Sequence, residues 1–166
     1  KLLTFSPSQS PAWSSKTPSG GAGKRWVNAY GFAGVAATAL GARKVFDGMN
    51  SAGLSAAALW MKEPSFGAGT GLEAEGDHIL AASDVVAWIL GQFTTVAQVK
   101  DHLQEVDVWY DHDVLPHPIH LVVHDASGAS LVVEWVNGQP QFFDSQSTPR
   151  YAGVLTNEPG YADQMG

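Results

Sequence analysis

Residues 47–61 read DGMNSAGLSAAALWM, and the interpretation of the whole chain builds outward from them. The first half contains turn residues: Asp47-Gly48 predicts one turn, and residues 50–53 predict a second. The second half, residues 54–61, is apolar and rich in alanine, which is typical of a strand buried on both faces. Trp60, near the end of that strand, is placed to line the mouth of a pocket. A hairpin that feeds a core strand, with Trp60 used only for packing, is the alternative interpretation.

The segment before this stretch predicts loops followed by strands. Residues 1–23 are rich in Ser, Pro and Gly and are expected to form loop, apart from the last turn of a strand at residues 2–5. Residues 26–40 alternate small and large apolar side chains, which predicts one or two strands. The glycines before Lys24 resemble a phosphate-binding loop, but their spacing is too short, and Arg25 stands where that loop needs a hydroxyl. Nucleotide binding is therefore rejected.

Two helices are expected in the middle of the chain. Residues 62–78 are glycine-rich without periodicity and predict a surface loop. Ser83 is a suitable N-cap for a helix that runs to about residue 93. Thr95 is the expected N-cap of a second helix that runs to about residue 106. Two adjacent helices of this kind would cover one face of a sheet.

The C-terminal half predicts an antiparallel meander. Ser127-Gly128 marks a turn, and Asn137-Gly138 is the strongest hairpin signal in the chain. Four strands are expected, at residues 117–125, 131–136, 141–143 and 153–156. Strands, then two helices, then a meander indicate the α+β class, with helices layered on an antiparallel sheet.

Composition narrows the function classes. The 166 residues suffice for a single domain over residues 1–166 with a real core. The net charge of -7 argues against nucleic-acid binding, which needs a basic face. No apolar run approaches the ~20 residues of a membrane span. The chain has no cysteine, so it contains neither a disulfide nor a thiol nucleophile, and redox chemistry does not indicate a compartment.

Histidines gather at positions 112, 117, 120 and 124, with two aspartates nearby. His120 and His124 share a strand face but lie roughly 13 Å apart at ~3.3 Å per residue, too far for one metal ion. Hydrogen-bonded or solvated histidines are therefore expected, and no metal site is assigned. A catalytic serine is also disfavoured, because the chain has no Gly-x-Ser-x-Gly motif and Ser55 falls in the buried strand.

Asn157 is the strongest single candidate for a catalytic group. It ends an apolar segment and precedes Glu158-Pro159, so the chain must turn there. A side-chain amide at such an end can donate to an oxyanion, and one such donor typically contributes ~10²–10³ in rate. An asparagine that only caps a turn remains the alternative.

Five segments in one order resemble the choloylglycine hydrolase family, which comprises the bile salt hydrolases and the penicillin V acylases. The segments are WVNAYG at 26–31, residues 47–61, the paired helices around residues 89–99, the strand–turn–strand of residues 120–134, and VLTNEP at 154–159. The resemblance implies the four-layer αββα sandwich of the N-terminal-nucleophile hydrolases. It also implies hydrolysis of a small acyl amide without a cofactor, by an N-terminal cysteine whose α-amino group acts as the base.

Carried onto this chain, the resemblance makes Asn157 and Trp60 the two oxyanion positions. A tryptophan at position 60 resembles the Gram-negative penicillin V acylases, some of which also cleave N-acyl homoserine lactones. The loops at residues 67–76 and 108–118 would border the acyl pocket. The implied substrate-binding residues are Trp60, Met61, Phe66, Trp109, Tyr110 and Leu115.

The chain also departs from the family pattern. The family's N-terminal Cys, with its nearby Arg and Asp, belongs before Lys1, and a further Arg belongs after Gly166. Ser51-Ala52 replaces the usual Glu-Lys. The chain is therefore expected to be a central segment of such an amidase, inactive alone. A non-catalytic relative that binds acyl compounds is the second hypothesis.

Compartment and assembly stay open. A periplasmic or secreted protein is expected if the likeness to Gram-negative acylases holds, and a cytoplasmic one otherwise. A homo-oligomer is also left open.

Overall fold

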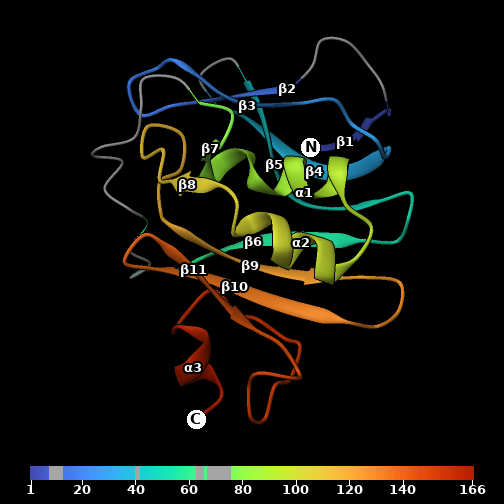
Figure 1. The fold of residues 1–166 in the computed structure, drawn as a ribbon, viewed down its shortest axis with the longest axis vertical. Helices are drawn as coiled ribbons and strands as arrows, with labels where there is room; N and C mark the ends of the chain where they lie inside the picture. The colour runs from blue at the N-terminus through green and yellow to red at the C-terminus, as the bar shows by residue number, and fades with distance from the viewer. Residues whose placement is uncertain (8–12, 40–41, 63–65, 67–75) are drawn as a thin grey trace.

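The computed structural model describes residues 1–7, 13–39, 42–62, 66 and 76–166. Its main feature is a seven-stranded sheet in the order β1-β4-β5-β6-β9-β10-β11, in which all neighbours are antiparallel. The strands are β1 (Leu2–Phe5), β4 (Phe32–Ala39), β5 (Ala42–Asn50), β6 (Ser55–Trp60), β9 (Ile119–His124), β10 (Ser130–Val136) and β11 (Gln139–Phe143). Helices α1 (Val85–Gln92) and α2 (Val96–Leu103) lie in front of this sheet in Figure 1. The predicted α+β class is confirmed.

Two small sheets accompany the large one. β2 (Trp13–Lys16) and β3 (Ala22–Trp26) form an antiparallel pair, while β7 (Ile79–Ala81) and β8 (Asp107–Trp109) are parallel. Both β2 and β3 pack against β7. The loop prediction for residues 1–23 is therefore wrong at residues 13–16 and 22–23, where aromatic pairing of Trp13 with Trp26 at 5.5 Å supports a hairpin.

The helices are η1 (Ala82–Asp84), α1 (Val85–Gln92), α2 (Val96–Leu103) and the short α3 (Tyr161–Gln164). Thr95 caps α2 as predicted, in a full capping box with Gln98. Ser83 does not cap α1, since its hydroxyl donates to Asp111 instead. This hydrogen bond to a residue far along the chain replaces the predicted N-cap bond to the backbone of α1.

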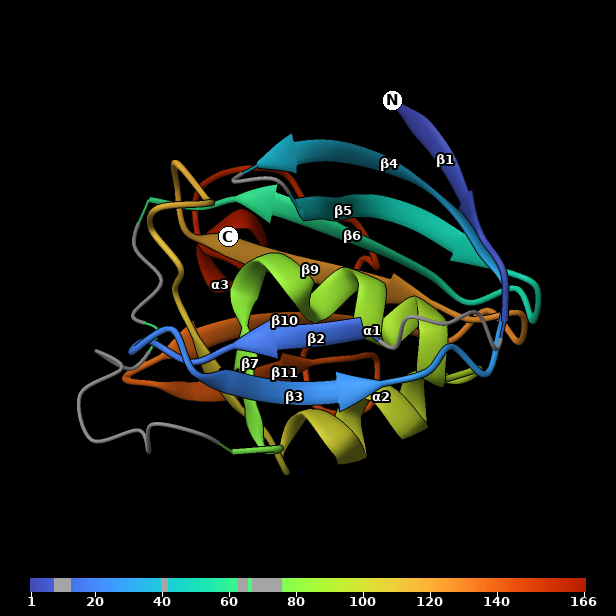
Figure 2. The ribbon, with the colours of Figure 1, turned by 90° about the horizontal axis from the view of Figure 1, so that it is seen from above.

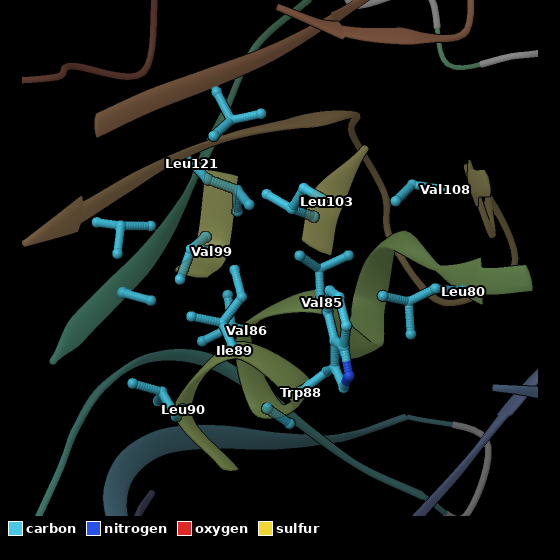
Figure 3. Packing of buried hydrophobic residues seen from close by; sticks show 14 of the residues in the cluster. Leu80, Val85, Val86, Trp88, Ile89, Leu90, Val99, Leu103, Val108 and Leu121 are labelled. Carbon is cyan, nitrogen blue, oxygen red and sulfur yellow. The ribbon is translucent and has the colours of Figure 1, made fainter. Parts of the chain in front are cut away.

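The core lies between α1, α2 and the large sheet. α1 packs on β5 and β6, and α2 contacts β10. Figure 3 shows Val85, Val86 and Ile89 of α1 facing Val99 and Leu103 of α2. These five residues are at most 1% exposed, and full burial of each side chain stabilises the fold by roughly 1.5–3 kcal/mol. This packing fixes the helix layer on one face of the sheet, as Figure 2 shows from above.

The opposite face is covered only in part. Glu134 alternates with the core residues Val133 and Trp135, so it points away from the helices. Its carboxylate contacts Tyr161, which places the C-terminal segment over β9 and β10. Farther along the sheet, Val35 is 49% exposed and Met49 is 55% exposed.

Two predictions for residues 47–61 are corrected. Asp47-Gly48 is not a turn but lies inside β5; the turn falls at residues 50–53, where Gly53 has φ 86°. β6 is not buried on both faces: Ala56 is buried, whereas Ala57 and the residues after it are only partly covered.

Residues 153–156 do not form the predicted strand. The carbonyl groups of Gly153 and Thr156 accept hydrogen bonds from histidine side chains of β9, and no neighbouring strand pairs with this segment among the described residues. The Asn137-Gly138 hairpin is confirmed, with both residues at positive φ. Among the described residues, no helix is long and apolar enough to cross a membrane.

Candidate active site

The end of β6 meets the C-terminal segment at one hydrogen bond. The backbone N–H of Trp60 donates to Oδ1 of Asn157 over 3.2 Å, although the two residues are 97 positions apart. β6 ends at this point beside Ile119 of β9, and Met61 N–H donates to the carbonyl of Pro118 at 3.0 Å. The two predicted oxyanion positions therefore lie together.

A cavity of about 580 Å³ opens beside this hydrogen bond. Its lining residues come from the end of β6, the entry to β9 and the C-terminal segment: Trp60, Met61, Lys62, His117, Thr156, Asn157 and Glu158. The indole of Trp60 is 48% exposed and lies 5.0 Å from the His117 ring, between centroids. At the rim, the Lys62 ammonium pairs with Glu158 at 3.2 Å. The cavity thus offers an apolar wall, an amide and a charged rim.

Asn157 is held through its backbone neighbours. The carbonyl oxygen of Thr156 accepts hydrogen bonds from Nε2 of His120 at 2.8 Å and from Nε2 of Gln164 at 3.2 Å. Gln164 Oε1 also accepts the N–H of Thr156 at 3.0 Å. The peptide before Asn157 is therefore fixed on both sides, while the asparagine side chain itself is exposed.

The arrangement supplies two N–H donors at one edge of a cavity. Asn157 Oδ1 accepts from Trp60, and Nδ2 has no hydrogen-bond partner among the residues that the structure describes. If the side-chain amide turned Oδ1 away from Trp60 N–H, that N–H and Nδ2 would both be available to an oxygen placed between them. Two N–H groups that converge in this way stabilise an oxygen that gains negative charge.

The remaining predicted pocket residues lie elsewhere. Trp109 donates from Nε1 to the carbonyl of Lys16 at 2.7 Å and lines a separate cavity of about 270 Å³. Phe66 stacks on Tyr110 and on Trp135, and Leu115 is fully buried. The structure brings Trp60 and Met61 to the cavity with Asn157, but not these four. Of the expected pocket loop at residues 67–76, residues 67–75 lie outside the described residues.

The histidines with aspartates nearby separate in space. His120 and His124 are bonded to backbone carbonyls, and His112 lies 3.2 Å from the exposed Asp113. Asp111 turns inward to Ser83, and burial raises the pKa of its carboxyl. Within the described part of the chain, no three such groups gather in a geometry that would hold a metal ion.

Sequence reasoning missed the pair of His120 and Glu134 behind Asn157. Nδ1 of His120 lies 3.0 Å from Oε1 of Glu134, and both side chains are buried. The register depends on the turn at residues 125–129, where Asp125 N–H donates to the carbonyl of Ala129; this turn sets which residues of β9 and β10 face each other.

Comparison with solved structures defines the fold. The chain aligns with penicillin V acylase from Agrobacterium tumefaciens with a TM-score of 0.74 and 24% identity, covering 99% of this chain and 46% of that one. A variant of conjugated bile acid hydrolase from Clostridium perfringens aligns with a TM-score of 0.72 and 22% identity, over 97% and 46%. The chain thus has the fold of these two hydrolases, in agreement with the predicted fold class.

The family follows from sequence. The model of the linear amide C–N hydrolases, choloylglycine hydrolase family, matches residues 14–165, and the chain belongs to this family. It is 30% identical over 118 residues to a bile salt hydrolase/transferase of Clostridium perfringens, covering 69% of this chain and 34% of that protein. It is 30% identical over 162 residues to a penicillin V acylase of Pectobacterium atrosepticum, covering 89% and 40%. The chain therefore spans less than half the length of the relatives it matches.

Proposed function

We propose that the whole protein hydrolyses linear amides, and that this chain supplies the oxyanion site and one wall of the acyl pocket. The observation that carries the proposal is the hydrogen bond between Trp60 N–H and Asn157 at the edge of a cavity. The relatives named above are a penicillin V acylase and a bile salt hydrolase/transferase, and both names describe amide chemistry.

In the proposed reaction, a cysteine thiolate from outside these 166 residues attacks the amide carbonyl carbon. The carbonyl oxygen takes up the electron pair and lies between Asn157 and the end of β6, after the Asn157 amide has turned Oδ1 away from Trp60 N–H. Asn157 Nδ2 and Trp60 N–H then both donate to that oxygen. The α-amino group of the same cysteine holds the proton taken from the thiol. When the C–N bond breaks, this α-ammonium group gives the proton to the leaving amine, and water then hydrolyses the remaining thioester.

The proposed acyl pocket favours flat, apolar groups. The half-exposed indole of Trp60 offers a face for stacking, and Met61 adds a polarisable side chain beside it. The cationic Lys62 at the rim suits substrates whose amine part carries a carboxylate. Phenoxyacetyl amides are therefore the first substrates to test, followed by conjugated bile salts and N-acyl homoserine lactones.

The test uses the full-length protein and measures the released amine. Asn157→Ala is expected to lower kcat by ~10²–10³ with a smaller change in KM, because the lost donor acts on the transition state. Asn157→Asp is the matched variant, which keeps the shape but presents an oxygen where a donor is needed. Wild-type turnover that survives in both variants contradicts the proposed role. A wild-type protein that binds these amides without turnover would favour the non-catalytic hypothesis instead.

A further inference from the structure

A buried pair of ionisable side chains lies directly behind the segment that carries Asn157. His120 on β9 has no exposed surface, and Glu134 on β10 is 5% exposed. The antiparallel register pairs Leu121 with Val133, so His120 lies opposite Glu134. Their side chains point to the face of the sheet that the C-terminal segment covers.

Both ring nitrogens of His120 face hydrogen-bond acceptors. Nε2 lies 2.8 Å from the carbonyl oxygen of Thr156, a group that cannot donate. Nδ1 lies 3.0 Å from Glu134 Oε1, which also accepts the N–H of Tyr161 at 2.7 Å. A ring between two acceptors satisfies both by carrying a proton on each nitrogen. The carboxylate of Glu134 then neutralises the buried imidazolium.

His120 and Glu134 form hydrogen bonds with the two ends of the segment of residues 156–161. The carbonyl of Thr156 belongs to the planar peptide unit that contains the backbone nitrogen of Asn157, so the bond from His120 orients that unit. Glu134 holds the other end through Tyr161 N–H. Figure 1 shows α3, which begins at Tyr161, beside the β10–β11 end of the sheet. Asn157 is exposed between the two anchors, and its direction follows from them.

We propose that His120 and Glu134 are positioning residues: the ring, kept doubly protonated by Glu134, aims the Asn157 amide at the end of β6. This proposal rests on the proposed function, in which Asn157 is an oxyanion donor. It gives neither residue a contact with substrate. It predicts that removal of the Glu134 charge alone disturbs Asn157, because a neutral ring has one proton for two acceptors.

Glu134→Gln in the full-length protein is the principal variant. Glutamine keeps the size of the side chain and an oxygen for Tyr161 N–H, but it no longer balances an imidazolium. A neutral His120 that keeps its bond to Thr156 has no proton on Nδ1. The glutamine atom in place of Oε1 then either faces that lone pair as an oxygen or, as the nitrogen, no longer accepts Tyr161 N–H. Because small displacements of a catalytic group reduce rate steeply, kcat for amide hydrolysis is expected to fall about tenfold or more, with KM within about twofold.

His124→Gln is the matched control. His124 lies on the same strand and face, and its Nε2 donates to the carbonyl of Gly153 at 3.0 Å. It bonds the same C-terminal segment, but four residues before Asn157 and without a carboxylate partner among the described residues. Its kcat and KM are expected to match wild type. Wild-type kcat in a folded Glu134→Gln protein, or an equal loss in His124→Gln, overturns the proposal.

Two readouts do not depend on activity. Hydrogen exchange at Trp60 N–H, which donates to Asn157, is expected to quicken about tenfold in Glu134→Gln and to stay unchanged in His124→Gln. In the wild-type protein, nitrogen NMR is expected to show both ring nitrogens of His120 protonated at neutral pH. A singly protonated ring overturns the proposal even if Glu134→Gln fails to fold. If wild type has no amidase activity, the proposed function fails, while these two measurements still decide the positioning role.

Discussion

Asn50, in the turn between β5 and β6, donates a hydrogen bond through Nδ2 to the backbone carbonyl of Leu90 at 3.0 Å, near the end of α1. The same Nδ2 donates to Phe93 O at 2.7 Å. Its Oδ1 accepts the N–H groups of Ala52 and Leu54, each at 3.0 Å. One amide that is 5% exposed therefore ties the hairpin turn to the helix layer and fixes where β6 begins.

Asn50→Ala is expected to lower the free energy of unfolding by roughly 2–4 kcal/mol, because it leaves several buried backbone groups without partners. Urea unfolding followed by circular dichroism measures the change. Asn157→Ala serves as the control, since that side chain is exposed, and its effect is expected to stay within about 1 kcal/mol. Equal, small effects of the two substitutions would argue against this role of Asn50.

Gly48 allows β5 to pack closely against β4 and α1. A Cβ atom at this position would lie 2.5 Å from the carbonyl oxygen of Ala33 and 2.9 Å from Cδ1 of Leu90. Gly48→Ala is therefore expected to destabilise the protein by roughly 2–3 kcal/mol, since the backbone of β4 must shift. A thermal melt measures this effect.

Gly128→Ala provides the comparison for Gly48. Gly128 has φ 88° in a solvent-exposed turn, and no heavy atom lies within 4 Å of a Cβ added there. Only backbone strain of roughly 1–2 kcal/mol is therefore expected. A smaller loss at Gly48 than at Gly128 would contradict the packing argument.

Asp144 is expected to make stability sensitive to acid. A hydrogen bond from Lys100 at 2.7 Å, supported by Ser147, holds the pKa of the Asp144 carboxyl well below its usual range. A carboxyl with a lowered pKa stabilises the fold above the unfolded-state value of about 3.9, and the contribution is lost as pH falls below it.

Asp144→Asn should therefore lower the free energy of unfolding by about 1 kcal/mol at pH 7, and by less at pH 3. Denaturant titrations of both proteins at the two pH values measure the difference. A gap between variant and wild type that does not shrink at pH 3 contradicts the assignment to this carboxylate.

Local sequence signals predicted the structure correctly where residues close together in the chain interact. The Thr95 capping box and the Asn137-Gly138 turn are such cases. Gly48 misled because glycine was interpreted as a turn residue, whereas it is needed for contact with β4 and α1. Residues 153–156 misled because apolar character predicted a strand, but the side chains of β9 bond their carbonyls.

The site was predictable in part for a related reason. The resemblance to a family brought Trp60 and Asn157 forward, and the structure places them together. The resemblance covered residues 120–134 but did not pair His120 with Glu134, whose relationship depends on strand register. The resemblance also implied Trp109 and Tyr110 through the loop at residues 108–118, but a place in that loop carries no information about the direction in which each ring turns.

The decisive measurement is a crystal structure of the full-length protein with an aldehyde analogue of a phenoxyacetyl amide bound to its nucleophile. Such a compound forms a tetrahedral adduct whose oxygen stands for the oxyanion. The account predicts that this oxygen lies within about 3.1 Å of both Asn157 Nδ2 and Trp60 N, with the side-chain amide of Asn157 turned from its present orientation. An adduct oxygen that points away from both groups would contradict it.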